Sequence, residues 1–182
     1  MQRKRYYTNT LEIIAAQLLT RYFPPQLTQA APLDVYDFAE NFLKLRVDFL
    51  NISPDKSILG LTSFNDGLIS SWDEQRQCSQ LVSIKKGTVV IDNSIVSEQY
   101  PGRERFTVAH ECSHQILHQY RYKNGTDATN TVLQCSQRSI EKLSSCEVRD
   151  VDWWLEWEAN RLAAELLMPR RAVSKLFYSA CG

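Results

Sequence analysis

The chain has 182 residues, a length that suggests a single domain large enough to bury a hydrophobic core. Its 21 Lys and Arg residues equal its 21 Asp and Glu residues, so the formal net charge is zero. A protein that binds the nucleic-acid backbone usually carries a basic surplus, so the composition argues against direct binding of DNA or RNA.

The cysteines of the chain are scattered and form no CxxC pair: Cys78, Cys112, Cys135, Cys146 and Cys181. Their odd number argues against a disulfide scaffold and favours free thiols in a reducing compartment. Cys135 and Cys146 are close enough in sequence to suggest a metal site, but two isolated cysteines are more often ordinary thiols, and we interpret them as thiols.

No stretch approaches the roughly 18 apolar residues that a membrane span needs, so no membrane insertion is expected. Basic residues near the N-terminus precede an apolar run that superficially resembles a secretion signal. However, Glu12 and Gln17 interrupt this run, and no cleavage site of small residues follows it. We therefore expect a cytoplasmic protein.

Two helices are predicted in the N-terminal part. Apolar residues recur at the spacing of one helix face in the first: Leu11, Ile14, Ala15, Leu18, Leu19 and Tyr22. This helix is expected to end near Phe23, because Pro24 and Pro25 cannot continue it. Pro32 and Asp34 then start the second helix.

Five short apolar or alternating segments predict strands, at 44–49, 58–64, 68–72, 81–84 and 88–91. The turn sequence Asn65-Asp66-Gly67 suggests that the third strand returns as the partner of the second. The sequence Lys85-Lys86-Gly87 suggests that the fourth and fifth strands form a hairpin. The first half is therefore expected to pack one or two helices on a small, mostly antiparallel sheet.

Two longer helices are predicted in the second half, because residues 103–119 and 151–168 have helical periodicity. The polar segment 120–150 between them is expected to be a long loop, with one helical turn near 140–143. The predicted fold is α+β, in a single domain over 1–182.

The three histidines of the chain lie four residues apart, at His110, His114 and His118, and the first two belong to an HExxH motif. Residues i and i+4 of a helix point the same way, so His110 and His114 can bind one Zn²⁺ at about 2.0–2.1 Å. Glu111 then lies beside the metal, where it can take a proton from bound water. The alternative is a solvated helix face with incidental histidines, which leaves their single stripe unexplained.

A catalytic zinc site needs a third protein ligand and an open position for water. His118 is one turn further along the same helix, and three ligands stacked on one helix cannot converge tetrahedrally. We therefore expect it to be partly exposed or to support a ligand. The third ligand is therefore expected from another helix. The best candidate is Glu156, because Asn160 shares its helix face and can hydrogen-bond a ligand. Glu158 is displaced by about 200° and is expected to point elsewhere. The alternative is a core helix whose acids are solvated.

Residues 103–118 read RERFTVAHECSHQILH, and residues 156–169 read EWEANRLAAELLMP. In this order the two blocks resemble the RxRFTxAHExxHxxLH and ExEANxFAAxLLMP blocks of the ImmA/IrrE family of bacterial zinc metallopeptidases. Leu162 replaces the usual Phe, which is a conservative change in packing. The resemblance covers roughly residues 30–175, and 1–29 would add an N-terminal helix and linker.

The resemblance implies a zincin-like active site on two helices, with His110, His114 and Glu156 as zinc ligands and Glu111 as general base. It implies a zinc metalloendopeptidase whose protein substrate is a helix-turn-helix repressor of a mobile element or a stress regulon. The alternative is a non-catalytic, zinc-containing regulator that binds and sequesters such a repressor. Many members of the family continue beyond the second block, so a C-terminal element is expected to be missing here.

Four residues near the motif have further expected roles. Tyr100, Arg103 and Arg105 are candidates for stabilising an oxyanion, although a structural role for each is the preferred interpretation. Cys112 lies inside the motif but faces about 200° away from His110, so we expect a buried packing thiol.

Overall fold

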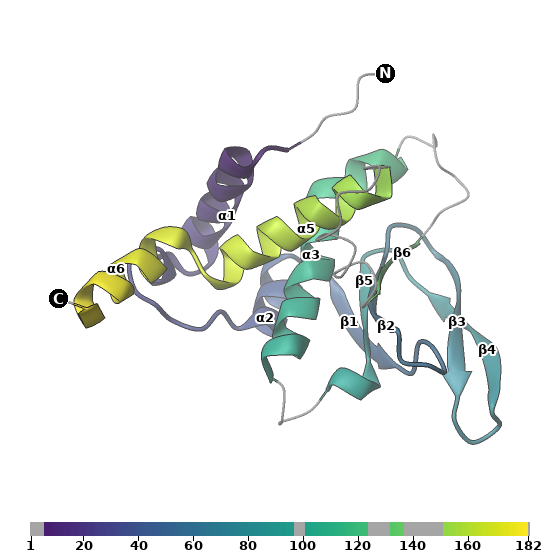
Figure 1. Ribbon diagram of the computed structural model, residues 1–182. Coiled ribbons are helices and arrows are strands. Elements are labelled where there is room, and N and C mark those ends of the chain that lie inside the picture. Colours follow the sequence, from purple (N-terminus) through teal and green to yellow (C-terminus); the bar gives the residue numbers. More distant parts are fainter. Residues whose placement is uncertain (1–5, 97–100, 124–131, 137–150, 182) are drawn as a thin grey trace.

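The computed structural model describes residues 6–96, 101–123, 132–136 and 151–181. The elements follow in the order α1 (Thr8–Tyr22), η1 (Pro24–Leu27), α2 (Val35–Asp37), η2 (Phe38–Phe42), β1 (Arg46–Leu50), β2 (Ile58–Ser63), β3 (Gly67–Asp73), β4 (Cys78–Ile84), β5 (Thr88–Asp92), η3 (Asn93–Ile95), α3 (Pro101–Lys123), β6 (Val132–Ser136), α5 (Val151–Leu167) and α6 (Arg170–Cys181). Helices lie beside small sheets, which confirms the α+β class (Figure 1). Within the described ranges, no helix is both long and apolar enough to cross a bilayer.

The N-terminal helices form where the sequence predicts them. α1 ends at Tyr22, and Pro24 and Pro25 then start the 3₁₀ turn η1, because proline lacks the N–H that would continue the α-helix. Asp34 caps α2, since its carboxylate accepts hydrogen bonds from two backbone N–H groups of the first turn. α2 continues into η2, a single turn of π-helix.

The main sheet has four strands in the order β1-β5-β2-β6. β1 pairs with β5 in parallel, whereas β2 pairs with β5 and β6 in antiparallel fashion. β3 and β4 form a separate two-stranded antiparallel sheet, drawn at the right of Figure 1. Most of the pairings are antiparallel, as expected, but two of the predicted partners are wrong.

The first wrong prediction is that β3 returns to pair with β2, because β3 pairs with β4 instead. The second is the hairpin of β4 and β5. Every residue of β5 is buried in the main sheet, whereas most residues of β4 are exposed in the two-stranded sheet. Gly87 redirects the chain with a φ of 73°. Its N–H donates to the Ser63 carbonyl at 2.8 Å, and its carbonyl accepts from the Arg46 N–H at 2.9 Å. These bonds insert β5 between β1 and β2.

β6 corrects a third prediction, because it lies in the polar segment that was expected to be a loop. Its register places Val132 opposite Ser63 and Cys135 opposite Gly60, with an irregularity near the start of β2. The helical turn predicted near 140–143 falls outside the described residues.

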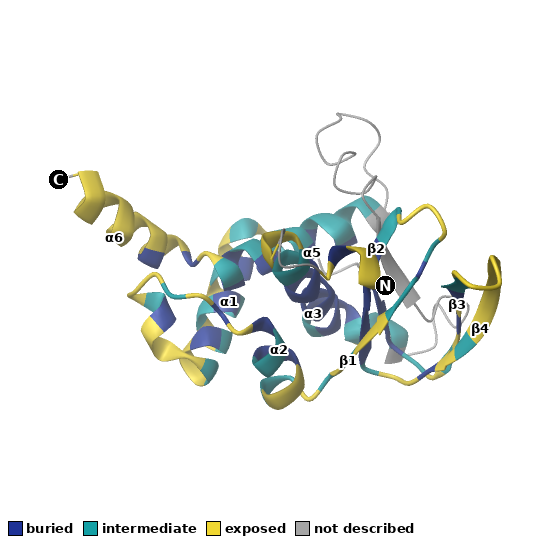
Figure 2. Ribbon diagram, turned by 90° about the horizontal axis from the view of Figure 1, so that it is seen from below, coloured by how far each residue is buried: buried dark blue, intermediate teal, exposed yellow. Residues whose placement is uncertain are grey.

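Two hydrophobic clusters stabilise the fold. The larger joins the helices to the main sheet, and its members include Leu11, Leu19, Phe38, Val89, Ile91, Val108, Leu162 and Leu166. The smaller lies under the β3–β4 hairpin and contains Ile52, Leu61, Ile69, Ile84 and Val90. α3 packs against α5 and against β2 and β5. Figure 2 shows its interior position and, in contrast, the exposed α6. Polar residues of α3 are therefore enclosed on several sides.

Candidate metal centre

α3 and α5 bring together His110, His114 and Glu156, with one ligand atom from each within 4.8 Å of the others. The Nε2 atoms of the two histidines are 2.9 Å apart. The Glu156 carboxylate reaches both, with Oε2 at 3.4 Å from His110 Nε2 and Oε1 at 3.3 Å from His114 Nε2. Both imidazoles are fully buried, and the Glu156 side chain is 12% exposed.

This triangle fits a metal ion. Ligand atoms about 2.0–2.1 Å from a tetrahedral ion lie about 3.3 Å from one another, and the observed separations run from 2.9 to 3.4 Å. Two imidazole nitrogens and one carboxylate form a donor set that suits zinc and leaves a fourth position open. The group could therefore hold one metal ion.

The protonation of the group also favours metal binding. Burial lowers the pKa of His114 to about 4, so this imidazole is neutral near pH 7; burial likewise lowers the pKa of His118, outside the group, to about 3. Burial alone would raise the pKa of Glu156, but the charge and hydrogen bonds of His114 and His110 outweigh it and lower this pKa well below its usual range. Neutral imidazole and ionised carboxylate are the forms that bind metals.

Asn160 lies one turn beyond Glu156 on α5, and its Oδ1 is 3.1 Å from His110 Nδ1. An amide oxygen only accepts hydrogen bonds, so His110 Nδ1 donates to it. The lone pair of a neutral His110 then lies on Nε2, the atom that faces His114 and Glu156. Asn160 thus orients one member of the group.

Glu111 is fully buried, and neither carboxylate oxygen has a hydrogen-bond partner among the described residues. Burial, followed by the negative charge of Glu156, raises the pKa of Glu111 well above its usual value. An orphaned carboxyl group is costly unless something else binds it. A metal-bound water beside the histidines would supply the missing partner.

Gly60 of β2 creates the space that Glu111 occupies. A Cβ at this position would lie 3.0 Å from Glu111 Oε1 and 2.8 Å from Thr107 Cγ2, both too close. The sequence interpretation did not single out Gly60. The available signal was an isolated glycine inside a strand pattern, which often marks a close approach to the backbone.

His118 and Glu158 lie beneath the metal group rather than in it. His118 is fully buried, so of its two expected positions partial exposure is wrong and contact with a candidate ligand is the one observed. Its Nδ1 is 2.9 Å from His114 Nδ1, and its Nε2 is 3.0 Å from Glu158 Oε2. Glu158 is 3% exposed, which contradicts the alternative of a solvated acid, and its Oε1 accepts a 2.7 Å hydrogen bond from the Tyr6 backbone N–H.

The other candidate residues near the motif lie outside the metal group. Cys112 is fully buried within the larger hydrophobic cluster, which confirms a packing thiol, and burial raises its pKa. Arg105 donates from Nη2 to the Leu33 carbonyl at 2.6 Å, which is a structural contact. Arg103 is exposed at the start of α3, and Tyr100 falls outside the described residues.

Comparison with models of known protein families gave no match, and no curated protein sequence matched the chain at a significant level. The resemblance to the ImmA/IrrE family therefore rests on the two sequence blocks alone.

Proposed function

We propose that the chain is a zinc-dependent metalloendopeptidase with a zincin-like active site of the ImmA/IrrE type. The observation that carries this proposal is the convergence of His110, His114 and Glu156 from two helices, beside the buried Glu111. Three protein ligands with a fourth position open are typical of a catalytic zinc, whereas a structural zinc normally has four protein ligands.

Zinc bound there would polarise a peptide carbonyl and lower the pKa of its water to about 7. Glu111 accepts the proton of the attacking water and passes it to the leaving amine. The raised pKa of the buried Glu111 makes its ionised form a stronger proton acceptor, and a zinc ion beside it would favour that ionised form. Asn160 keeps the His110 ring in the orientation that ligation needs. The reaction is hydrolysis of a peptide bond.

The proposed substrate is a helix-turn-helix transcriptional repressor of a mobile element or a stress regulon, cleaved in the cytoplasm. The substrate class rests on the resemblance of the two sequence blocks. A zero net charge supports a protein partner rather than nucleic acid. Scattered cysteines without CxxC pairs support a reducing compartment.

The test is incubation of the purified protein with the repressor encoded beside it, with and without a chelator, followed by an immunoblot for fragments. Wild type should cleave the repressor only when zinc is present. Glu111→Gln should retain zinc and cleave about 10²–10⁴-fold more slowly, because an amide cannot accept the proton.

A promoter reporter separates cleavage from sequestration. If Glu111→Gln relieved repression fully while the repressor stayed intact, the chain would be a non-catalytic regulator that binds and sequesters its partner. Fragments produced by wild type alone, together with relief of repression by wild type alone, are the outcome that supports a peptidase.

A further inference from the structure

A line of polar contacts runs from the metal group to the N-terminal segment. His114 Nδ1 is 2.9 Å from His118 Nδ1, His118 Nε2 is 3.0 Å from Glu158 Oε2, and Glu158 Oε1 accepts from the Tyr6 N–H. All three side chains are buried. We propose that Glu158 and His118 are positioning residues that fix the tautomer of His114, so that its Nε2 lone pair faces the metal. This inference rests on the proposed zinc site.

The direction of each hydrogen bond follows from the donors and acceptors available. A carboxylate accepts, so His118 Nε2 carries the proton and donates to Glu158. A neutral imidazole has one donor and one acceptor, so His118 Nδ1 accepts. Its partner, His114 Nδ1, must then donate. The remaining lone pair of His114 lies on Nε2, which is the atom 3.3 Å from Glu156.

His110 and His114 are thus prepared for the metal by two different devices. His110 Nδ1 meets an amide oxygen of Asn160 directly. His114 Nδ1 faces another histidine, which could equally donate or accept, so the contact alone leaves its tautomer undefined. Glu158 removes this ambiguity by fixing the proton of His118. Without it, the proton could move to His114 Nε2 and block the ligand atom.

The tautomers can be observed directly in the metal-free protein by long-range ¹H–¹⁵N NMR. The chain has only three histidines, and each signal can be assigned with a single His→Gln variant. The expected result is a proton on Nδ1 of His110 and His114 and on Nε2 of His118. A proton on Nε2 of His114, or rapid averaging of its two tautomers, would overturn the inference whether or not zinc binds.

Zinc affinity provides the second measurement, by competition with a chelator of known affinity. Glu158→Ala should weaken the zinc Kd by about 10–100-fold, the usual effect of losing a group that orients a metal ligand. The matched control is Glu165→Ala, which removes another buried carboxylate of α5 that pairs with Arg161 instead of a histidine. Its zinc Kd should equal that of wild type.

The outcomes separate this inference from the proposed function. Failure of wild type to bind zinc would overturn the metallopeptidase, whereas the tautomers would still be testable. Tight zinc binding by wild type with an unchanged Kd in a folded Glu158→Ala would overturn the positioning role alone. If Glu158→Ala did not fold, the wild-type NMR spectrum would decide, because it requires no variant.

Discussion

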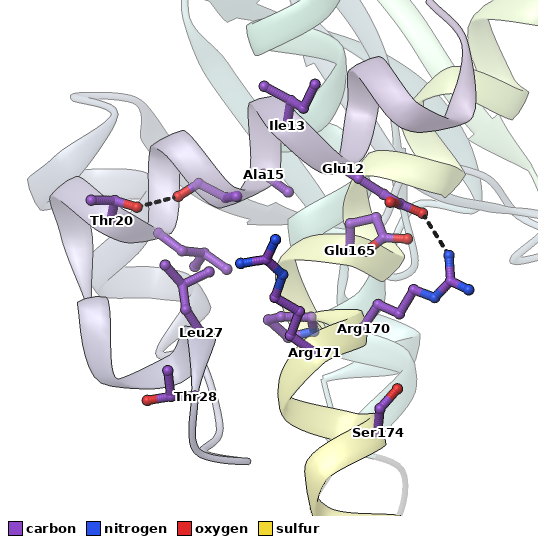
Figure 3. Close-up of a pocket in the computed structure, with 13 residues that line it drawn as sticks. Glu12, Ile13, Ala15, Thr20, Leu27, Thr28, Glu165, Arg170, Arg171 and Ser174 are labelled. Atoms are coloured by element: carbon purple, nitrogen blue, oxygen red, sulfur yellow. Dashed lines mark hydrogen bonds and ion pairs between the residues drawn. The ribbon is translucent and has the colours of Figure 1, made fainter.

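α5 contributes to two regions of very different character. Near its middle it faces α3 across the metal group. Near its end it borders a groove of about 840 Å³ between α1 and α6 (Figure 3). Both carboxylates that line the groove are in ion pairs: Glu12 pairs with Arg161 and Arg170, and Glu165 pairs with Arg161. Arg171 also lines the groove, among apolar and hydroxyl-bearing side chains.

The α3–α5 interface has the opposite properties. It contains a buried carboxyl, Glu111, without a hydrogen-bond partner among the described residues, and three possible ligand atoms that lie within 4.8 Å of one another. The groove and the candidate metal group therefore lie apart on α5. Buried polar groups with unused hydrogen-bonding capacity distinguish the metal group, and such groups are typical of functional sites.

The largest expected effect comes from removing a ligand. Glu156→Ala should reduce bound zinc from about one ion per chain to almost none, because two histidines alone do not complete a zinc site. The matched control is Glu12→Ala in the groove, which should retain zinc fully. Elemental analysis after dialysis against zinc gives the measurement. Loss of zinc from Glu12→Ala, or two zinc ions per wild-type chain, would contradict the proposal of a single zinc site between α3 and α5.

The next effect concerns the space beside Glu111. Gly60→Ala should lower the rate of cleavage by about 10²-fold, because its methyl group displaces the Glu111 carboxylate by a fraction of an ångström or more. Zinc binding should persist, since no ligand moves. Gly102→Ala is the control, because no atom lies within 4 Å of its new methyl group. Equal rates for the two variants would show that Gly60 does not hold the general base in place.

Removal of the metal should destabilise one region more than the other. Free zinc at 100 times its Kd should stabilise the fold by about 2.7 kcal/mol, which corresponds to roughly 5–10 °C in Tm for a domain of this size. A chelator should therefore lower Tm by that amount. Hydrogen exchange should accelerate in α3 and α5 but not in α6. Uniform acceleration over all three helices would mean that the two regions are not independent.

The smallest effect is expected on the far side of α3. Cys112→Ala should cost about 1 kcal/mol of unfolding free energy, because it leaves a small void in the larger hydrophobic cluster. Its zinc Kd should not change, since Cys112 faces away from the metal group. Urea unfolding and chelator competition measure the two quantities. A weaker zinc affinity in this variant would show that Cys112 contributes to the metal centre.

The sequence predicted those features that depend on neighbours along the chain. Helix periodicity and the prolines after Tyr22 act locally, so α1, α3 and α5 were found near their observed bounds, whereas α6 was not predicted. Strand partners were not, because β5 joins β1 and β2 through contacts of Gly87 that no local pattern encodes. β6 was missed because its five residues lie inside the long polar segment 120–150, which as a whole resembles a loop.

The same distinction applies to the site. HExxH spacing predicted that His110, Glu111 and His114 share one region of a helix, and the i, i+4 pair of Glu156 and Asn160 indicated the second helix. Local spacing does not predict contacts between segments that are far apart in the sequence. Examples are the close approach of β2 to α3 and the link from Glu158 to the N-terminal segment.

That link has a thermodynamic consequence. One oxygen of Glu158 accepts from the Tyr6 N–H, and the other accepts from His118, so a single carboxylate ties the segment before α1 to the support of His114. If the group binds zinc as proposed, attachment of this segment and zinc binding are linked equilibria. Such coupling is reciprocal: the factor by which the attached segment tightens zinc equals the factor by which zinc retains the segment. A probe placed near Tyr6 would therefore report on metal bound between α3 and α5.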